Sequence, residues 1–321
     1  MPGAEQLNTS QADRILGALY GLACGDALGA TLEFLDAATI RAKHGPGGLR
    51  EIVGGGWLNL RPGETTDDTD MTLCVAEGIA AAGPDAPTEA IAEEIGRRFG
   101  VWLDSHPPDV GATVAAAILA YRRLGSWDAA TRDVEARFGP RAAGNGALMR
   151  ALPVSFPWRD PDRIAAVSRA VTRLTHPTAT AEWCSLLYNL AVRAALDGMP
   201  ADRAVAWAGR VLPAAAPDLG DMHRTLWRRV ARAHRLPRGD VETPSGYCVD
   251  TLVAALWAVL GARTAEDAIV RAANLGGDAD TVAAVAGGLA GAVWGAAAIP
   301  SRWLARLEPR NRLAAAAKAL A

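Results

Sequence analysis

The chain has 321 residues, of which 50% are hydrophobic and 21% charged, a balance typical of a globular protein with a large buried core. Its formal net charge of −2 provides no field that would attract nucleic acid or an anionic membrane, so nucleic-acid binding is not expected. Only four Phe and four Tyr accompany an Ala-rich apolar composition, which favours helices over strands.

Apolar residues recur at helical spacing along most of the chain, and no alternating run is long enough to predict a sheet. The expected helices, in chain order, cover 12–33, 71–82, 88–103, 113–124, 161–175, 179–197, 202–212, 222–234, 247–260, 264–273, 281–298 and 302–320. The Pro- and Gly-containing breaks between them are too short for interdomain linkers. We therefore predict an all-α protein, with a flexible N-terminal segment over 1–11 and a single compact, orthogonal multi-helix domain over 12–321.

The cysteines and the N-terminus predict a cytoplasmic protein. Cys24, Cys74, Cys184 and Cys248 lie far apart in apolar helical stretches, without the grouping of a disulfide framework or a zinc site. We interpret them as buried free thiols in a reducing compartment. The first 14 residues are polar and lack the apolar core of a signal peptide.

The segment 281–300 has no charged residue over the length of a membrane span, and Gly287 and Gly291 form a GxxxG motif. A membrane span is therefore one interpretation of this segment. However, it consists mainly of Ala and Gly and directly follows Asp278 and Asp280. We predict a buried central helix that its neighbours approach closely, without membrane insertion.

The longest stretch without periodicity, 44–66, leads as a Gly-rich loop into the sequence Thr-Asp-Asp-Thr-Asp over 66–70. One Thr or Asp would suffice to cap the helix that follows. Three aspartates within four positions repel one another unless a cation lies among them. The junction between loop and helix supplies the irregular backbone that consecutive ligands need.

A second cluster of the same composition, NLGGDADT over 274–281, also enters an apolar helix. A single DxD pattern is weak evidence, because such patterns occur in caps and turns. Two clusters together predict a paired-metal site with oxygen ligands, which suits Mg²⁺ or Mn²⁺ better than zinc.

Seven motifs occur in the same order as in the ADP-ribosylglycohydrolase family, which the chain resembles over nearly its whole length. They are GLACGDALGATLEF from residue 21, GETTDDTDM, PPDVG, GNGALMR, THP, GYCVDTLVAALW and NLGGDADT. The resemblance implies the all-helical domain of that family and includes its dinitrogenase reductase-activating branch.

The resemblance also implies a metal centre and its catalytic acids. Two divalent cations, Mg²⁺ or Mn²⁺, would be bound by Thr66, Asp67, Asp68, Asp278, Asp280 and Thr281. Asp109 would touch the ribose whose bond is cleaved, although a turn residue after two prolines is an equal alternative. Glu33 is the second choice for proton transfer. Asp70 is left out as a solvated acid, and Asp26 is expected to support the site or a helix cap.

For the rest of the substrate, the resemblance implies contacts to the diphosphate and distal ribose by Gly144, Asn145, Gly146, Met149 and Arg150. His176 would orient the phosphates or a ribose. Tyr247 would stack on adenine, with a buried tyrosine at a helix start as the alternative.

The predicted activity is metal-dependent hydrolysis of the N-glycosidic bond of a mono-ADP-ribosylated protein, which releases ADP-ribose. Arginine-linked substrate is favoured, because the matching stretches resemble the arginine-specific branch of the family. Acids expected at the cleft rim, such as Glu33, Glu64 or Asp70, would also attract a guanidinium. Two alternatives remain: a metal-dependent phosphohydrolase acting on a small phosphorylated ligand, and a module that only binds ADP-ribose or neutralises a toxin.

Overall fold

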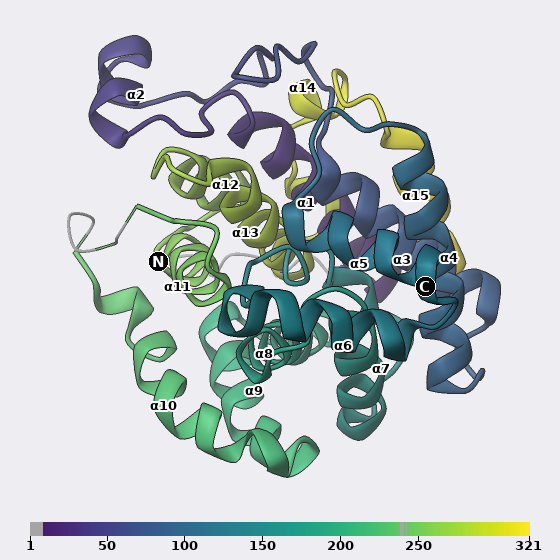
Figure 1. Cartoon of the computed structure of the whole chain (residues 1–321). Coiled ribbons are helices and arrows are strands. Elements are labelled where there is room, and N and C mark those ends of the chain that lie inside the picture. Colours follow the sequence, from purple (N-terminus) through teal and green to yellow (C-terminus); the bar gives the residue numbers. More distant parts are fainter. Residues whose placement is uncertain (1–8, 238–240, 242) are drawn as a thin grey trace.

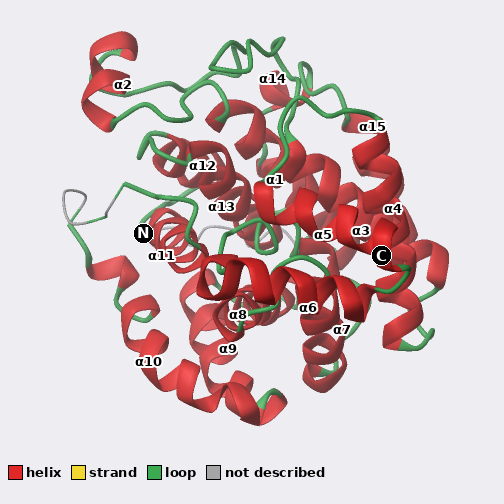
Figure 2. Ribbon diagram, viewed as in Figure 1, coloured by secondary structure: helices red, strands yellow, loops and turns green. Residues whose placement is uncertain are grey.

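In a computed structural model, residues 9–237, 241 and 243–321 are described, and these form an all-helical architecture without strands (Figures 1 and 2). The helices are α1 (Gln11–Gly29), α2 (Ala37–His44), α3 (Asp67–Ala82), α4 (Thr88–Asp104), α5 (Ala112–Leu124), α6 (Trp127–Phe138), α7 (Pro161–Arg173), α8 (Ala179–Leu196), α9 (Ala201–Ala215), α10 (Gly220–Val230), α11 (Cys248–Leu260), α12 (Ala265–Ala273), α13 (Ala279–Trp294), α14 (Ser301–Leu304) and α15 (Arg310–Leu320). The predicted all-α class is confirmed.

Helices α1 and α13 pack against each other along their length and run antiparallel near the centre of the molecule (Figure 1). Glycines at every fourth position of α1 face α13. A Cβ atom at Gly21 would lie 2.2 Å from the Gly287 carbonyl oxygen, and one at Gly25 would lie 2.0 Å from the Ala283 carbonyl oxygen. Only glycine permits this approach of two backbones. The end of α1 is thereby fixed beside the start of α13.

The uncharged segment predicted to be a buried central helix is α13, most of whose side chains are buried. Among the described residues, no helix combines the length and the hydrophobicity that crossing a membrane requires. All four cysteines are buried and free, as predicted.

The structure corrects several predicted helix boundaries. The helices α2 and α6 were not predicted: α2 buries only Ile40, and α6 buries a narrow stripe beginning at Trp127. The helix expected over 302–320 is two helices, α14 and α15, and α1 ends at Gly29 rather than at 33. Residues 1–8 of the predicted N-terminal segment lie outside the described residues, so the division at residue 12 stays a prediction.

Candidate active site

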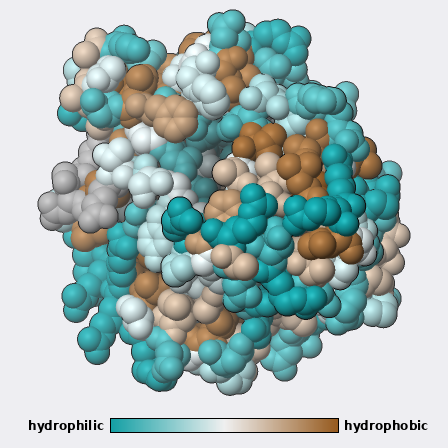
Figure 3. Space-filling view, in the orientation of Figure 1, coloured by the Kyte–Doolittle hydropathy of each residue, from teal (hydrophilic) through white to brown (hydrophobic). Residues whose placement is uncertain are grey.

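A cavity of about 430 Å³ lies where the end of α1, the starts of α3 and α13, and three loops meet. Figure 3 looks onto a face of the molecule that is hollowed near its centre. Six carboxylates line the cavity and are called here the carboxylate cluster: Glu33, Asp67, Asp68, Asp109, Asp278 and Asp280. Among the described residues, no Lys or Arg lines it. The negative charge of the cluster is therefore not neutralised by the lining of the cavity.

The first turn of α3 is organised by Asp26, a fully buried carboxylate on α1. It accepts hydrogen bonds from the backbone N–H and hydroxyl of Thr66, at 3.0 Å each, and from those of Thr69, at 3.1 and 2.6 Å. Of the two roles expected of Asp26, these bonds show the support of a helix start. Thr66 precedes α3 with extended backbone and turns Asp67 and Asp68 toward the cavity.

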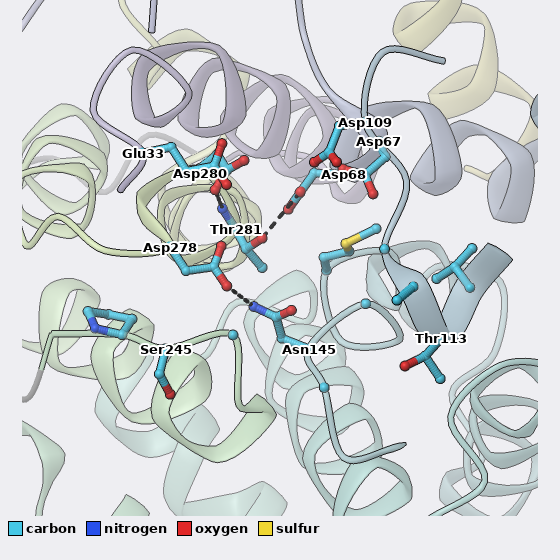
Figure 4. A pocket seen from close by; sticks show the side chains of 18 of the residues that line it. Glu33, Asp67, Asp68, Asp109, Thr113, Asn145, Ser245, Asp278, Asp280 and Thr281 are labelled. Carbon is cyan, nitrogen blue, oxygen red and sulfur yellow. Dashed lines mark hydrogen bonds between the residues drawn. The ribbon is translucent and has the colours of Figure 1, made fainter. Parts of the chain in front are cut away.

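The two predicted clusters, 213 residues apart in sequence, meet in the cavity (Figure 4). The Thr281 hydroxyl donates to Asp68 Oδ2 at 3.3 Å, and Asp280 Oδ1 accepts from the Thr281 backbone N–H at 2.8 Å. Asp278 occupies the N-cap position of α13 without making a capping hydrogen bond. Its Oδ2 accepts instead from Asn145 Nδ2 at 2.6 Å.

The electrostatics of the cluster fit a bound cation. Burial, followed by repulsion from neighbouring carboxylates, raises the pKa of Asp67, Asp68 and Asp280 well above the usual range. The Oδ1 atom of Asp68 is buried without a hydrogen-bond partner. One oxygen each from Glu33, Asp278 and Asp280 lie within 4.8 Å of one another. A divalent cation would satisfy this oxygen donor set and remove the repulsion.

Two further acids of the cluster differ in their surroundings. Glu33 is buried, and burial raises its pKa to about 7 even though the indole N–H of Trp57 donates to its Oε2. Asp109 is half-buried on the loop between α4 and α5, and burial also raises its pKa. Both carboxylates line the cavity.

The opposite wall of the cavity is the segment 144–146 together with Met149. The Asn145 backbone N–H donates to the Gly246 carbonyl oxygen at 2.9 Å, and Gly144 forms an isolated β-bridge with Tyr247. These bonds join the Gly-rich segment to the start of α11. Glycine is required at 146, because a Cβ atom there would lie 2.9 Å from His176 Cε1.

A hydrogen-bonded chain beneath this wall sets the tautomer of His176. Arg150 Nη2 donates to Thr175 Oγ1 at 2.6 Å, and this hydroxyl lies 2.7 Å from His176 Nδ1. Burial lowers the pKa of His176 to about 3, so the ring is neutral. Among the described residues, Nδ1 is the only acceptor found for the Thr175 hydroxyl hydrogen, so we assign this hydrogen to Nδ1 and the ring proton to Nε2. That nitrogen faces the backbone of 144–146.

Most of the residues predicted for the site line this one cavity, and three do not. Thr66 lies just behind it, and Arg150 is fully buried, where its guanidinium donates to the Gly146 carbonyl oxygen and stacks 4.7 Å from the Phe99 ring. Tyr247 directly follows the lining residue Gly246 and is 37% exposed, so it is not a buried tyrosine.

Two predicted rim acids lie elsewhere, which corrects that expectation. Asp70 is half-buried, accepts from Trp102 Nε1 at 3.2 Å and lines a separate cavity with Arg312. Its carboxylate is hydrogen-bonded to the Trp102 indole and does not line the cavity of the carboxylate cluster. Glu64 is ion-paired with Arg61 at the surface.

Sequence reasoning did not find the contacts of Trp57 and Thr175. The available signals were a tryptophan directly after three glycines and a threonine directly before the motif histidine. Neither signal predicts the partner, because the partner is distant in sequence. Trp57 lies 24 residues from Glu33, and Thr175 lies 25 residues from Arg150.

Comparison with known proteins identifies the family. The family model described as ADP-ribosylglycohydrolase matches residues 7–321. The chain is 34% identical to the ADP-ribosyl-(dinitrogen reductase) glycohydrolase of Rhodospirillum rubrum, over 92% of this chain and 90% of that protein. It is also 34% identical to the ADP-ribosylarginine hydrolase Tri1 of Serratia proteamaculans, over 96% of this chain and 79% of that protein.

A solved structure described as an ADP-ribosylglycohydrolase-related protein complex has the same fold. It superposes with a TM-score of 0.77 at 35% identity and covers 97% of this chain and 98% of that one. Together with the match of the family model over nearly the whole sequence, this similarity shows that the chain is a hydrolase and belongs to the ADP-ribosylglycohydrolase family.

Proposed function

We propose that this protein hydrolyses the N-glycosidic bond between ADP-ribose and an arginine side chain of a modified protein, and releases free ADP-ribose. The observation that carries the proposal is a cavity lined by six carboxylates and, among the described residues, by no Lys or Arg. The linkage is inferred from relatives, two of which are named for their action on ADP-ribosylarginine, at 34% and 35% identity.

Two divalent cations, Mg²⁺ or Mn²⁺, would be held by Thr66, Asp67, Asp68, Asp278, Asp280 and Thr281. The unpartnered Oδ1 atom of Asp68 supports this assignment. When bound, such ions act as Lewis acids toward the ribose hydroxyls and the attacking water. The Thr66 hydroxyl donates its hydrogen to Asp26, which leaves a lone pair of its oxygen free for a cation.

Proton transfer is assigned to Asp109, with Glu33 as the second candidate. Asp109 is half-buried and lines the cavity, and its raised pKa brings it closer to the value that favours general base catalysis near neutral pH. Burial raises the pKa of Glu33 to about 7. However, one of its carboxylate oxygens lies within 4.8 Å of oxygens of Asp278 and Asp280, close enough for the three to share a cation. A cation held by Asp278 and Asp280 would also attract the Glu33 carboxylate, whereas Asp109 belongs neither to that group nor to the proposed ligands, so Asp109 is the first candidate.

The ADP-ribose moiety would lie along the opposite wall. Backbone N–H groups of 144–146 suit the diphosphate oxygens, and the Nε2–H of neutral His176 supplies one further donor. Met149 forms an apolar part of the wall, and the exposed ring of Tyr247 is free to stack on adenine. Arg150 contributes by supporting Gly146 and Thr175 from below.

The test is to incubate the protein with arginine-linked and serine-linked mono-ADP-ribosylated peptides and to quantify the products. We expect free ADP-ribose from the arginine-linked peptide. Release of inorganic phosphate would instead support a phosphohydrolase, and tight ADP-ribose binding without turnover would support a binding module.

A further inference from the structure

We propose that Phe34 and Trp57, called here the aromatic pair, bind the guanidinium group of the modified arginine at the mouth of the cavity. This inference rests on the proposed function and assigns the residues that select its leaving group. It starts from an unusual exposure: the aromatic pair is 67% and 51% exposed. Among the described residues, the only other aromatic side chain with comparable exposure is Tyr247, at 37%.

The two rings of the aromatic pair form an open angle beside the carboxylate cluster. Their centroids lie 5.5 Å apart with the ring planes inclined by 52°. Phe34 lines the cavity, and the Trp57 indole N–H donates to Glu33. This bond uses the edge of the indole, so the faces of the ring remain available to a ligand.

The backbone fixes the positions of both aromatic residues, and at Phe34 this requires a strained conformation. Phe34 has φ of 61°, a left-handed conformation that a bulky residue rarely adopts. The Phe34 N–H donates to the Gly277 carbonyl oxygen at 2.7 Å, and the Gly277 N–H donates to Leu35 at 2.8 Å. Trp57 follows Gly56, whose Cβ position would be 2.2 Å from the Ala30 carbonyl oxygen. Both loops are thus fixed against the end of α1.

The aromatic pair lies at the end of the cavity where the scissile bond would be held. Phe34 is bonded to the residue that precedes Asp278, next to the candidate metal ligands. Tyr247 instead pairs with Gly144 at the wall proposed for the phosphates. A group that leaves the anomeric carbon therefore passes the aromatic pair, whereas adenine lies toward Tyr247.

The chemistry of this end favours a planar cation. Aromatic faces attract guanidinium groups, and nearby carboxylates attract the same positive charge. Two divalent cations would carry four positive charges against the six carboxylates of the cluster, so this end keeps a net negative charge, and no Lys or Arg among the described lining residues offsets it. A serine-linked substrate offers no positive charge and would gain nothing from the aromatic pair.

The experiment compares the unaltered protein with Trp57→Leu, Trp57→Phe and the control Val53→Ala, which truncates another exposed apolar side chain of the same loop. KM and kcat are measured on an arginine-linked ADP-ribosyl peptide. The affinities for free ADP-ribose and for a serine-linked peptide of the same sequence are measured by competition. Trp57→Phe loses the donor to Glu33 but keeps an aromatic face.

We expect Trp57→Leu to raise KM for the arginine-linked peptide about three- to thirty-fold, the range of one cation–π contact. Its affinities for ADP-ribose and for the serine-linked peptide should stay unchanged. Trp57→Phe should retain most of the affinity for the arginine-linked peptide, and Val53→Ala all of it. If Trp57→Phe and Trp57→Leu lost the same affinity for the arginine-linked peptide, the inference would be overturned. The role of Trp57 would then be to position Glu33 through the indole N–H.

A parallel loss of ADP-ribose affinity in Trp57→Leu would also overturn it, since the ring would then contact the ADP-ribose itself. Absence of ADP-ribose release from every peptide would refute the proposed function. In that case, fluorescence anisotropy with a labelled arginine-linked peptide still decides the inference, because the variants are expected to differ in binding by the same factor.

Discussion

Neighbouring aspartates at the start of α3 face different surroundings. Asp67 lines the cavity, whereas Asp70 accepts from Trp102 outside it. We expect Asp67→Asn and Asp280→Asn each to lower kcat at least about a hundredfold, because each removes an anionic oxygen ligand of a cation that stabilises the transition state.

Asp70→Asn is the matched control for this prediction, since it makes the same chemical change one helical turn away from the cluster. Its kcat should remain within about threefold of the unaltered protein, the scale of an interaction outside the site. Steady-state release of ADP-ribose measures all three variants. An effect of Asp70→Asn as large as that of Asp67→Asn would contradict the ligand assignment.

The proton position on His176 depends on one hydroxyl. Thr175→Val removes the hydroxyl that donates to Nδ1. The tautomer with the proton on Nε2 is then no longer favoured over the other. We expect the Kd for ADP-ribose to rise about five- to thirty-fold, the scale of one or two buried hydrogen bonds. Isothermal titration in the presence of Mg²⁺ measures this change.

The control is Thr131→Val, because Thr131 is also buried and donates to a backbone carbonyl at 3.0 Å, but it does not line the cavity. Thr175→Val should lose more stability than Thr131→Val, because it also removes the hydroxyl that accepts from the buried Arg150 guanidinium, and only Thr175→Val should lose affinity. Equal ADP-ribose affinity in the two variants would show that the hydrogen bond between Thr175 and His176 does not govern binding.

At the scale of elements, the approach of α1 and α13 fixes the distance between the candidate metal ligands. Gly25→Ala would place a methyl group 2.0 Å from the Ala283 carbonyl oxygen, so the two helices must separate. We expect a loss of about 2–4 kcal/mol in unfolding free energy from overpacking, and weaker binding of Mn²⁺. Denaturant unfolding and metal titration measure the two effects.

Gly100→Ala is the control for this prediction. Gly100 is also helical, in α4, but a Cβ atom there would meet nothing within 4 Å. We expect it to stabilise the protein by up to about 1 kcal/mol, since Ala has the higher helix propensity. A Gly25→Ala protein as stable as Gly100→Ala would contradict the tight packing of α1 and α13.

The limits of sequence reasoning are visible in the same elements. Periodicity and motif order predicted the helical fold and brought together the residues of α3 and α13 that form most of the cluster. The short helix α2 escaped prediction because it buries one residue, Ile40. The contact of Trp57 with Glu33 escaped because it joins two loops whose paths no local pattern determines. Arg150 was expected at the ligand, but lies beneath the wall that Gly146 forms.

At the scale of the whole molecule, the carboxylate cluster links stability to pH. Burial raises the pKa of Asp26 to about 6 and of Glu33 to about 7, and raises those of Asp67, Asp68 and Asp280. The folded chain therefore binds protons at these acids more tightly than the unfolded chain. In chelator, the contribution of Asp26 and Glu33 to stability is present below the unfolded pKa near about 4 and is lost as pH rises through about 6 and about 7, respectively.

We therefore expect the melting temperature in chelator to fall between pH 5 and pH 8 and the stabilisation by Mn²⁺ or Mg²⁺ to grow over the same range, because cations bind the ionised carboxylates. Chelation should also abolish activity, and added metal should restore it. Differential scanning calorimetry of the unaltered protein and of Asp280→Asn provides the comparison. A variant with an unchanged pH slope would contradict this origin of the effect.

The pairing of α1 with α13 has a consequence for how the protein is made. The two helices form one face of the site, yet about 250 residues of chain are synthesised between them. Such distant pairing raises the contact order, and it slows folding because a long loop must close before its contacts form. While the ribosome is still adding that intervening chain, the glycine face of α1 has no partner and Asp68 has no Thr281 beside it. A nascent chain interrupted before α13 therefore carries half of a metal site and no hydrolase activity.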